Sequence, residues 1–128
     1  MNKILLVEDD KPTIELYEEV FKRAGFEIET LDFGYKAIER IKEIKEGKKE
    51  KPDLILLDLI LPDMNGILIL EEAKKYPETQ DLRFFALTNY LDPELNQELI
   101  KKGVEKILPK TNFTPLQLVE IVKSALKK

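Results

Sequence analysis

The sequence predicts a doubly wound α/β fold in which five parallel strands alternate with five helices. Short apolar runs alternate five times with longer segments whose apolar residues recur at helical spacing. The third and fourth runs, residues 53–57 and 83–87, are almost continuously apolar, which is typical of strands covered by helices on both faces. A length of 128 residues fits one hydrophobic core, so we expect residues 1–128 to form a single domain.

Capping residues and apolar periodicity set the boundaries of the elements. Asp10 is a plausible N-cap of the first helix, and Asp92-Pro93 and Thr114-Pro115 each place a cap before a first-turn proline. Glycines follow the first, second and fourth helices, as is common at helix ends. The expected order is strand 3–7, helix 11–24, strand 27–31, helix 34–46, strand 53–57, helix 65–75, strand 83–87, helix 93–103, strand 105–108 and helix 115–127.

The last helix has an apolar stripe that predicts which of its faces is buried. The residues of this stripe are Leu116, Val119, Val122 and Leu126. Leu118 and Ile121 lie off the stripe, so we expect them to contribute to a partner surface.

Composition excludes several classes of function. The chain has no Cys, which rules out disulfides, thiolate zinc sites and a Cys nucleophile. It also has no His, so any metal must be held by oxygen atoms, which favours Mg²⁺. The net charge is −4 with both signs interspersed, which argues against a nucleic-acid-binding surface. No apolar run is long enough to span a membrane, and we expect a cytoplasmic protein.

Acidic residues follow two of the predicted strands. Glu8, Asp9 and Asp10 come after the first strand, and Asp58 comes after the third. Because the carboxyl ends of parallel strands meet at one edge of the sheet, these carboxylates should lie close together. Such a cluster survives folding if it holds a divalent cation or shares protons.

The fourth and fifth strands bring a hydroxyl and an amine to the same edge. Thr88 follows the fourth strand and Lys110 follows the fifth. This combination suits phosphoryl chemistry, because a metal and a lysine neutralise phosphoryl oxygens while a hydroxyl donates a hydrogen bond. One of the carboxylates can itself be the nucleophile and form an acyl phosphate.

These residues, in this order, resemble the receiver domain of bacterial two-component response regulators, over nearly the whole chain. The most specific match is Asp58 with the loop Pro62-Asp63-Met64-Asn65-Gly66, and Glu8-Asp9, Thr88 and Lys110 match in their expected places. The resemblance, which extends to chemotaxis-regulator-like proteins, implies a flavodoxin-like (βα)5 fold with strand order 2-1-3-4-5. It also implies a receiver domain with no output domain in residues 1–128.

The resemblance implies a role for each site residue. Asp58 would accept a phosphoryl group from a phosphohistidine. Asp9, Asp58 and the backbone carbonyl of Ile60 would bind Mg²⁺, and Glu8 would help directly or through water. Lys110 would pair with Asp58 at rest and with the phosphoryl group afterwards, and Thr88 would move to hydrogen-bond the phosphoryl oxygen.

The implied function is a phosphorylation-controlled signalling switch rather than a conventional turnover enzyme. The protein would catalyse its own phosphoryl transfer and a slow autodephosphorylation. Its donor would be a sensor histidine kinase or a histidine phosphotransfer protein. An unknown downstream protein would bind the fourth helix, fifth strand and fifth helix, with no direct contact to nucleic acid or membrane, and a homodimer is a further option.

The chain departs from the family pattern at several positions. Ile107 stands where the switch aromatic usually lies, with Tyr90 as the nearest aromatic, and Asn89 replaces a small residue. Pro109-Lys110-Thr111 replaces the usual Lys-Pro, and because a cis bond before Thr111 would cost ~2.5–4 kcal/mol, we expect it to be trans. Ile60 and Tyr90 flank the site, so we expect them to shield an acyl phosphate from water.

Three other functions compete with the switch. A degenerate receiver would keep the fold and bind partners without phosphorylation. A phosphatase of the haloacid dehalogenase type would require Asp-x-Asp after its first strand, where this chain has Glu8-Asp9-Asp10. A flavin-binding protein would require a Ser/Thr/Gly-rich phosphate loop at the same place, where these acids would repel phosphate.

Overall fold

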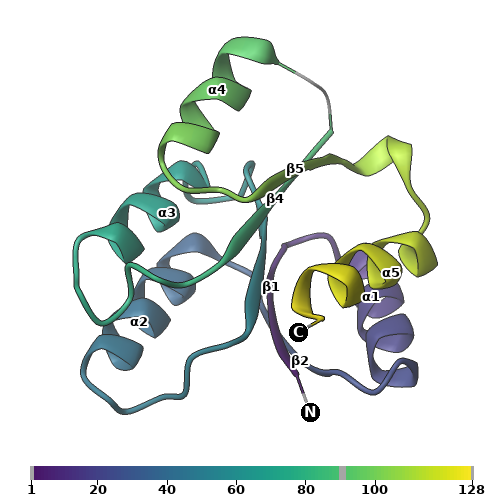
Figure 1. Ribbon diagram of the computed structural model, residues 1–128, viewed down its shortest axis with the longest axis horizontal. Coiled ribbons are helices and arrows are strands. Elements are labelled where there is room, and N and C mark those ends of the chain that lie inside the picture. The colour runs from purple at the N-terminus through teal and green to yellow at the C-terminus, as the bar shows by residue number, and fades with distance from the viewer. Residues whose placement is uncertain (1, 90–91, 128) are drawn as a thin grey trace.

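The structure, a computed structural model that describes residues 2–89 and 92–127, confirms the predicted fold (Figure 1). Five parallel strands form one sheet in the order β2-β1-β3-β4-β5. The elements are β1 Lys3–Val7, α1 Lys11–Arg23, β2 Glu27–Leu31, α2 Gly34–Lys45, β3 Leu54–Asp58, α3 Ile67–Lys74, β4 Phe84–Thr88, α4 Pro93–Lys101, β5 Lys106–Pro109, a 3₁₀ turn Lys110–Asn112, and α5 Pro115–Leu126.

The sheet is covered by helices on both faces. Figure 1 shows α1 and α5 on one side of the sheet and α2, α3 and α4 on the other. Alternate side chains of each central strand enter opposite cores: Leu54 and Leu56 pack on the α1–α5 side, and Ile55 and Leu57 pack on the α2–α4 side. All residues of β3 and β4 are buried, and each large apolar side chain contributes roughly 1.5–3 kcal/mol by burial. The central strands therefore form a rigid base for the residues at their ends.

The last three strands lie one residue further along the chain than predicted. β3, β4 and β5 therefore end at Asp58, Thr88 and Pro109, because the ladder pairing continues to these residues. Asp58 lies opposite Leu87, and Thr88 lies opposite Pro109. Two candidate site residues are thus the last residues of strands, which fixes their backbones.

The predicted helix caps are confirmed. Asp10 accepts from the Thr13 N–H at 3.1 Å, and Asp92 accepts from two backbone N–H groups of α4. Thr114 and Gln117 form a reciprocal capping box at the start of α5. α3 begins at residue 67, two residues later than predicted, because the Asn65 side chain accepts the Ile67 N–H at 2.9 Å and ends the preceding loop. In the part of the chain that is described, no helix is long and apolar enough to cross a bilayer.

The predicted buried face of α5 was wrong at its start. Leu116 is 67% exposed, whereas Leu118 is fully buried. Successive residues are rotated by about 100° around a helix, so Leu116 and Leu118 lie on nearly opposite sides, and the face that meets the sheet is centred on Leu118, Val119 and Val122. Ile121 is half-buried and packs against the same core, so Leu118 and Ile121 serve packing rather than a free partner surface.

Candidate functional site

The carboxyl ends of β1, β3, β4 and β5 meet at one edge of the sheet, as predicted. A hollow of about 360 Å³ opens there. It is lined by Glu8, Asp9, Asp10, Thr13, Asp58, Ile60, Asn89 and Lys110. The candidate residues from the first, third and fifth strands are therefore brought together, although they are separated by up to 102 positions in the sequence.

Asp58 is buried at the end of β3 and both of its carboxylate oxygens have partners. One oxygen, Oδ1, accepts the backbone N–H of Ile60 at 3.2 Å. The other, Oδ2, accepts a hydrogen bond from the Lys110 ammonium group at 3.3 Å. The carboxylate is thus held between its own loop and β5, and its orientation is fixed from two sides.

Glu8 is more deeply buried than Asp58, with 1% of its surface exposed. Its Oε1 accepts from the Lys110 amine at 2.6 Å, a shorter contact than the one between Lys110 and Asp58. Its Oε2 accepts the backbone N–H groups of Asp9 and Asp10. The amine expected to pair with Asp58 therefore bridges two carboxylates and lies nearer to Glu8.

Burial and charge change the acidity of this group of residues. Burial raises the pKa of Glu8, the hydrogen bond from Lys110 opposes this, and the charge of Asp58 raises it further. Burial also acts to lower the pKa of Lys110, but the hydrogen bond to Glu8 and the charge of Asp58 outweigh it, so that this pKa is raised. The lysine is therefore protonated at neutral pH and compensates part of the negative charge.

Three carboxylates form a group that can hold a metal ion. Glu8, Asp9 and Asp58 each offer an oxygen, and these oxygens lie within 4.8 Å of one another. Asp9 is exposed, so an ion can reach the group from solvent. A set made only of carboxylate oxygens fits a hard divalent cation such as Mg²⁺ or Mn²⁺.

The loop after Asp58 is a tight turn that returns to the end of its own strand. Ile60 and Asn65 form an isolated antiparallel bridge, and the Gly66 N–H donates to the Leu59 carbonyl at 2.7 Å. A Cβ at position 66 would lie 2.6 Å from the Asp58 carbonyl oxygen. The loop can close in this way only with glycine at position 66, which accounts for Gly66 in the motif.

The positions that depart from the family pattern have clear locations. Thr88 is buried at the end of β4, while Asn89 is exposed and lines the hollow. Ile107 packs into the apolar cluster on the α2–α4 side. No cis peptide bond occurs in residues 2–89 and 92–127, so the bond before Thr111 is trans, as expected. Tyr90, named above as the nearest aromatic and predicted to shield the site, lies outside the described residues.

Comparison with known proteins agrees with this geometry. The family model of the response regulator receiver domain matches residues 4–123 of the sequence. The chain belongs to this family. Its acidic cluster is typical of a receiver metal site. The phosphatase and the flavin protein are therefore set aside.

Curated relatives include the transcriptional regulatory protein CpxR of Klebsiella pneumoniae, at 32% identity over the whole chain and 50% of the relative. The CpxR homolog of Haemophilus influenzae is 31% identical over the whole chain and 52% of its own length. The receiver chain thus spans about half the length of these relatives.

Solved structures with the same fold include two in functional states. One is the Mn²⁺-bound form of response regulator Rcp1, at 29% identity and a TM-score of 0.83, covering 97% of this chain and 93% of that one. Another is the phosphorylated cyanobacterial phytochrome response regulator RcpA, at 29% identity and a TM-score of 0.80, covering 97% and 90%. The chemotaxis regulator CheY4 of Vibrio cholerae is 25% identical with a TM-score of 0.83, covering 98% and 99%.

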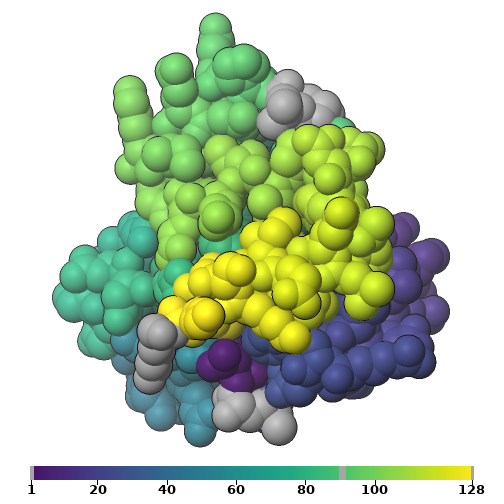
Figure 2. Space-filling model, turned by 45° about the vertical axis from the view of Figure 1, so that its right-hand side comes forward, coloured from purple at the N-terminus to yellow at the C-terminus, as the bar shows by residue number. Residues whose placement is uncertain are grey.

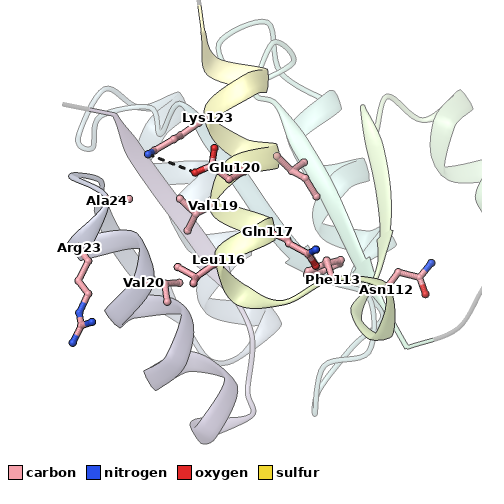
Figure 3. A pocket seen from close by; sticks show the side chains of 11 residues that line it. Val20, Arg23, Ala24, Asn112, Phe113, Leu116, Gln117, Val119, Glu120 and Lys123 are labelled. Atoms are coloured by element: carbon pink, nitrogen blue, oxygen red, sulfur yellow. Dashed lines mark ion pairs between the residues drawn. The ribbon is translucent and has the colours of Figure 1, made fainter.

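A larger hollow of about 760 Å³ lies away from the acidic edge, between α1 and α5 (Figure 3). Figure 3 shows Leu116 extending from α5 toward Val20 of α1, with the charged groups of Arg23 and Lys123 at the rim. Figure 2 shows the same two helices side by side at the surface. Its lining does not include the three-carboxylate cluster of the acidic edge, so size alone does not identify the site.

Sequence reasoning missed one contact at the site. Asp63, in the loop after Asp58, accepts the backbone N–H groups of Gly34 at 2.8 Å and Tyr35 at 2.9 Å. These N–H groups begin α2, whose N-cap residue Phe33 provides no side-chain cap. The missing cap before residue 34 was the signal, since a helix start without a local acceptor usually finds one elsewhere.

Proposed function

We propose that this chain is a phosphorylation-controlled switch in which Asp58 is the phosphoacceptor. A carboxylate oxygen of Asp58 attacks the phosphorus of a phosphohistidine, the new O–P bond forms as the P–N bond breaks, and the imidazole nitrogen leaves with the electron pair. The product is an acyl phosphate. The observation that carries this proposal is the position of Asp58, buried at the end of β3 within the acidic cluster and hydrogen-bonded to Lys110.

Glu8, Asp9, Asp58 and the backbone carbonyl of Ile60 would hold Mg²⁺. The bound ion would neutralise phosphoryl oxygens and allow them to approach the acidic cluster. Lys110 already lies within hydrogen-bonding distance of Asp58. Its ammonium group could therefore form an ion pair with the phosphoryl group once Asp58 is phosphorylated. The ligand set consists of oxygen donors, and the Mn²⁺-bound relative supports this assignment.

Thr88 and the backbone N–H of Asn89 would bind the remaining phosphoryl oxygens. Both residues lie at the end of β4, beside the phosphoacceptor strand. A shift of the Thr88 hydroxyl toward the new phosphoryl group would favour an active arrangement of the surface formed by α4, β5 and α5. A downstream protein would read this surface, and a second copy of the chain is another partner for it.

The protein would act in the cytoplasm on a sensor histidine kinase or a histidine phosphotransfer protein. It would not turn over a small substrate, and its own catalysis would be limited to phosphoryl transfer and hydrolysis. Ile60 is 59% exposed at the edge of the hollow, so its side chain can cover an acyl phosphate and slow hydrolysis. Replacing it in I60N should shorten the lifetime of the phosphorylated protein, and an unchanged lifetime would count against shielding.

The deciding experiment is intact mass spectrometry after incubation with acetyl phosphate. The wild type should gain the mass of one phosphoryl group only when Mg²⁺ is present, and D58N should gain none. D53N is the matched control, because Asp53 is an exposed acid before β3 that accepts from the Lys3 backbone N–H, and it should be phosphorylated normally. A wild type that folds and gains no mass would refute the proposal.

One observation favours a second candidate, a receiver that binds partners without phosphorylation. Ile107 fills the place of the switch aromatic and packs into the α2–α4 core, which removes the usual route from Thr88 to the surface. Partner binding that is equal in wild type and D58N would support this second function.

A further inference from the structure

The loop that follows Asp58 is attached to α2 at two points. The Asp63 carboxylate accepts the first two N–H groups of α2, with one oxygen on Gly34 at 2.8 Å and the other on Tyr35 at 2.9 Å. The Met64 side chain packs directly on Gly34, where an added Cβ would overlap Met64 Cγ and lie 2.6 Å from its Sδ. A charged acceptor at a helix start also interacts favourably with the helix dipole.

The same stretch of chain also contacts the other loop of the site. The carbonyl of Leu31, at the end of β2, accepts the Glu8 N–H at 3.1 Å. The connection from residue 31 to residue 35 therefore binds the loop that carries Glu8 at one end and the loop that carries Ile60 at the other. The contact with Leu31 uses the backbone of Glu8, and the contacts with Gly34 and Tyr35 use Asp63. The side chains of the acidic cluster take part in neither.

Asp63 lies at the tip of the turn whose base holds Ile60. Ile60 bridges to Asn65, and the Leu61 N–H donates to the Met64 carbonyl at 3.2 Å, so the two arms of the turn are hydrogen-bonded to each other. Asp63 itself is exposed and has no contact with the acidic cluster that could explain it as a metal ligand. Its two hydrogen bonds hold the tip, and through the paired arms they hold the backbone at Ile60.

We propose that Asp63 is a positioning residue for metal binding: by fixing the tip of the 59–66 loop on the first turn of α2, it sets the backbone of Ile60 for the cation. This inference rests on the proposed function, since it concerns the Mg²⁺ site of that function. Loss of the contact raises the entropy of the loop and weakens Mg²⁺ binding without removing any carboxylate of the cluster.

The test compares D63A, D63N and D32A by calorimetric titration with Mg²⁺. Asp32 is the matched control, because it is an acid in the same connection whose partner is Lys36 of α2 rather than the loop. D63A should raise the Kd for Mg²⁺ roughly tenfold, at the lower end of what outer-shell partners contribute. D32A should change it by less than about twofold, because exposed charges are largely screened at physiological salt. D63N has a single acceptor oxygen and can keep only one of the two hydrogen bonds, so its Kd should lie between those of wild type and D63A.

Two further results separate a positioning role from the alternatives. Equal weakening in D63A, D63N and D32A would mean that only charge matters and would overturn the proposal. A lower melting temperature for D63A with an unchanged Kd would also overturn it, because the contact would then serve stability alone.

Hydrogen exchange keeps this test independent of the proposed function. In metal-free protein, the amides of residues 59–66 should exchange faster in D63A than in wild type or D32A. A wild type that binds no Mg²⁺ would refute the proposed metal site, whereas unchanged exchange in D63A would refute the positioning role of Asp63.

Discussion

Removing the amine of Lys110 is the sharpest perturbation that the site offers. In K110A, two buried carboxylates lose the cation that lies 2.6 Å from Glu8 and 3.3 Å from Asp58. At an effective dielectric constant of about 20, each contact has a gross Coulomb energy of roughly 5–6 kcal/mol. Desolvation of the three charges offsets much of this energy, and breaking a buried pair typically costs about 3–5 kcal/mol.

The structure favours the lower end of this range for K110A. The Lys110 side chain is 17% exposed and the hollow opens to solvent, so water can enter and screen the remaining carboxylates. We therefore expect the free energy of unfolding at neutral pH, without divalent metal, to fall by about 3 kcal/mol. Saturating Mg²⁺ should recover more stability in K110A than in wild type, because the ion then supplies the missing positive charge.

The pH dependence of the free energy of unfolding provides a second test of this prediction. The pKa of Glu8 is raised by burial, and removing Lys110 takes away a contact that lowers it. A carboxyl group whose pKa is raised on folding binds protons more readily in the folded state, so stability falls as pH rises through the interval above its ordinary pKa. The deficit of K110A should therefore shrink as the pH is lowered into that interval.

The assay is urea unfolding followed by far-UV circular dichroism, with and without Mg²⁺. K106A is the control, because Lys106 is an exposed residue of β5 and its loss changes the net charge equally. If K110A and K106A unfold at the same urea concentration in the absence of metal, the ion-pair argument for the site is wrong.

Three further predictions concern the buried face of α5, an ion pair between β2 and α2, and the loop after Asp58. L118A should lower the free energy of unfolding by about 3 kcal/mol because Leu118 is fully buried, whereas L116A should change it by less than about 0.5 kcal/mol; chemical denaturation compares them. Arg40 lowers the pKa of Glu29, so this pair stabilises the fold above the ordinary Glu pKa and its contribution is lost as pH falls through the lowered value. Because Glu29 is partly exposed, R40Q should lower the free energy of unfolding by under about 1 kcal/mol at neutral pH. It should also make this free energy fall less steeply as the pH is lowered into the acid range. G66A should cost about 2 kcal/mol and weaken Mg²⁺ binding, because its Cβ meets backbone atoms that cannot move aside; calorimetry with Mg²⁺ tests the second effect.

Much of the fold could be predicted from local signals in the sequence. Asp10, Asp92 and Thr114 each act within three residues of their own position, so their capping role needs no knowledge of the tertiary structure. The acidic edge was predictable because parallel strands place all their carboxyl ends together, which brings Glu8 and Asp58 into one site.

The predictions were wrong or incomplete where contacts between distant parts of the chain determine the structure. The ladder with β4 determines that β3 includes Asp58, and no local pattern distinguishes residues 53–57 from 54–58. The orientation of α5 against the sheet determines that Leu118 is buried and Leu116 is not, although both are leucines near the start of the same helix. The contact of Asp63 with α2 joins residues 28 and 29 positions apart, and only the missing cap at Phe33 indicates it in the sequence.

The two halves of the proposed switch depend on the sequence in different ways. Phosphoryl acceptance needs a few groups at strand ends, and Glu8, Asp58 and Lys110 are held there by contacts within 3.3 Å. Transmission needs a second arrangement of side chains that phosphorylation can favour. At position 107 a partly buried isoleucine packs against the α2–α4 core, and it has no polar group that could exchange one hydrogen-bond partner for another. If the chain does signal through α4, β5 and α5, a displacement of Thr88 must therefore reach that surface without a switching aromatic side chain at position 107.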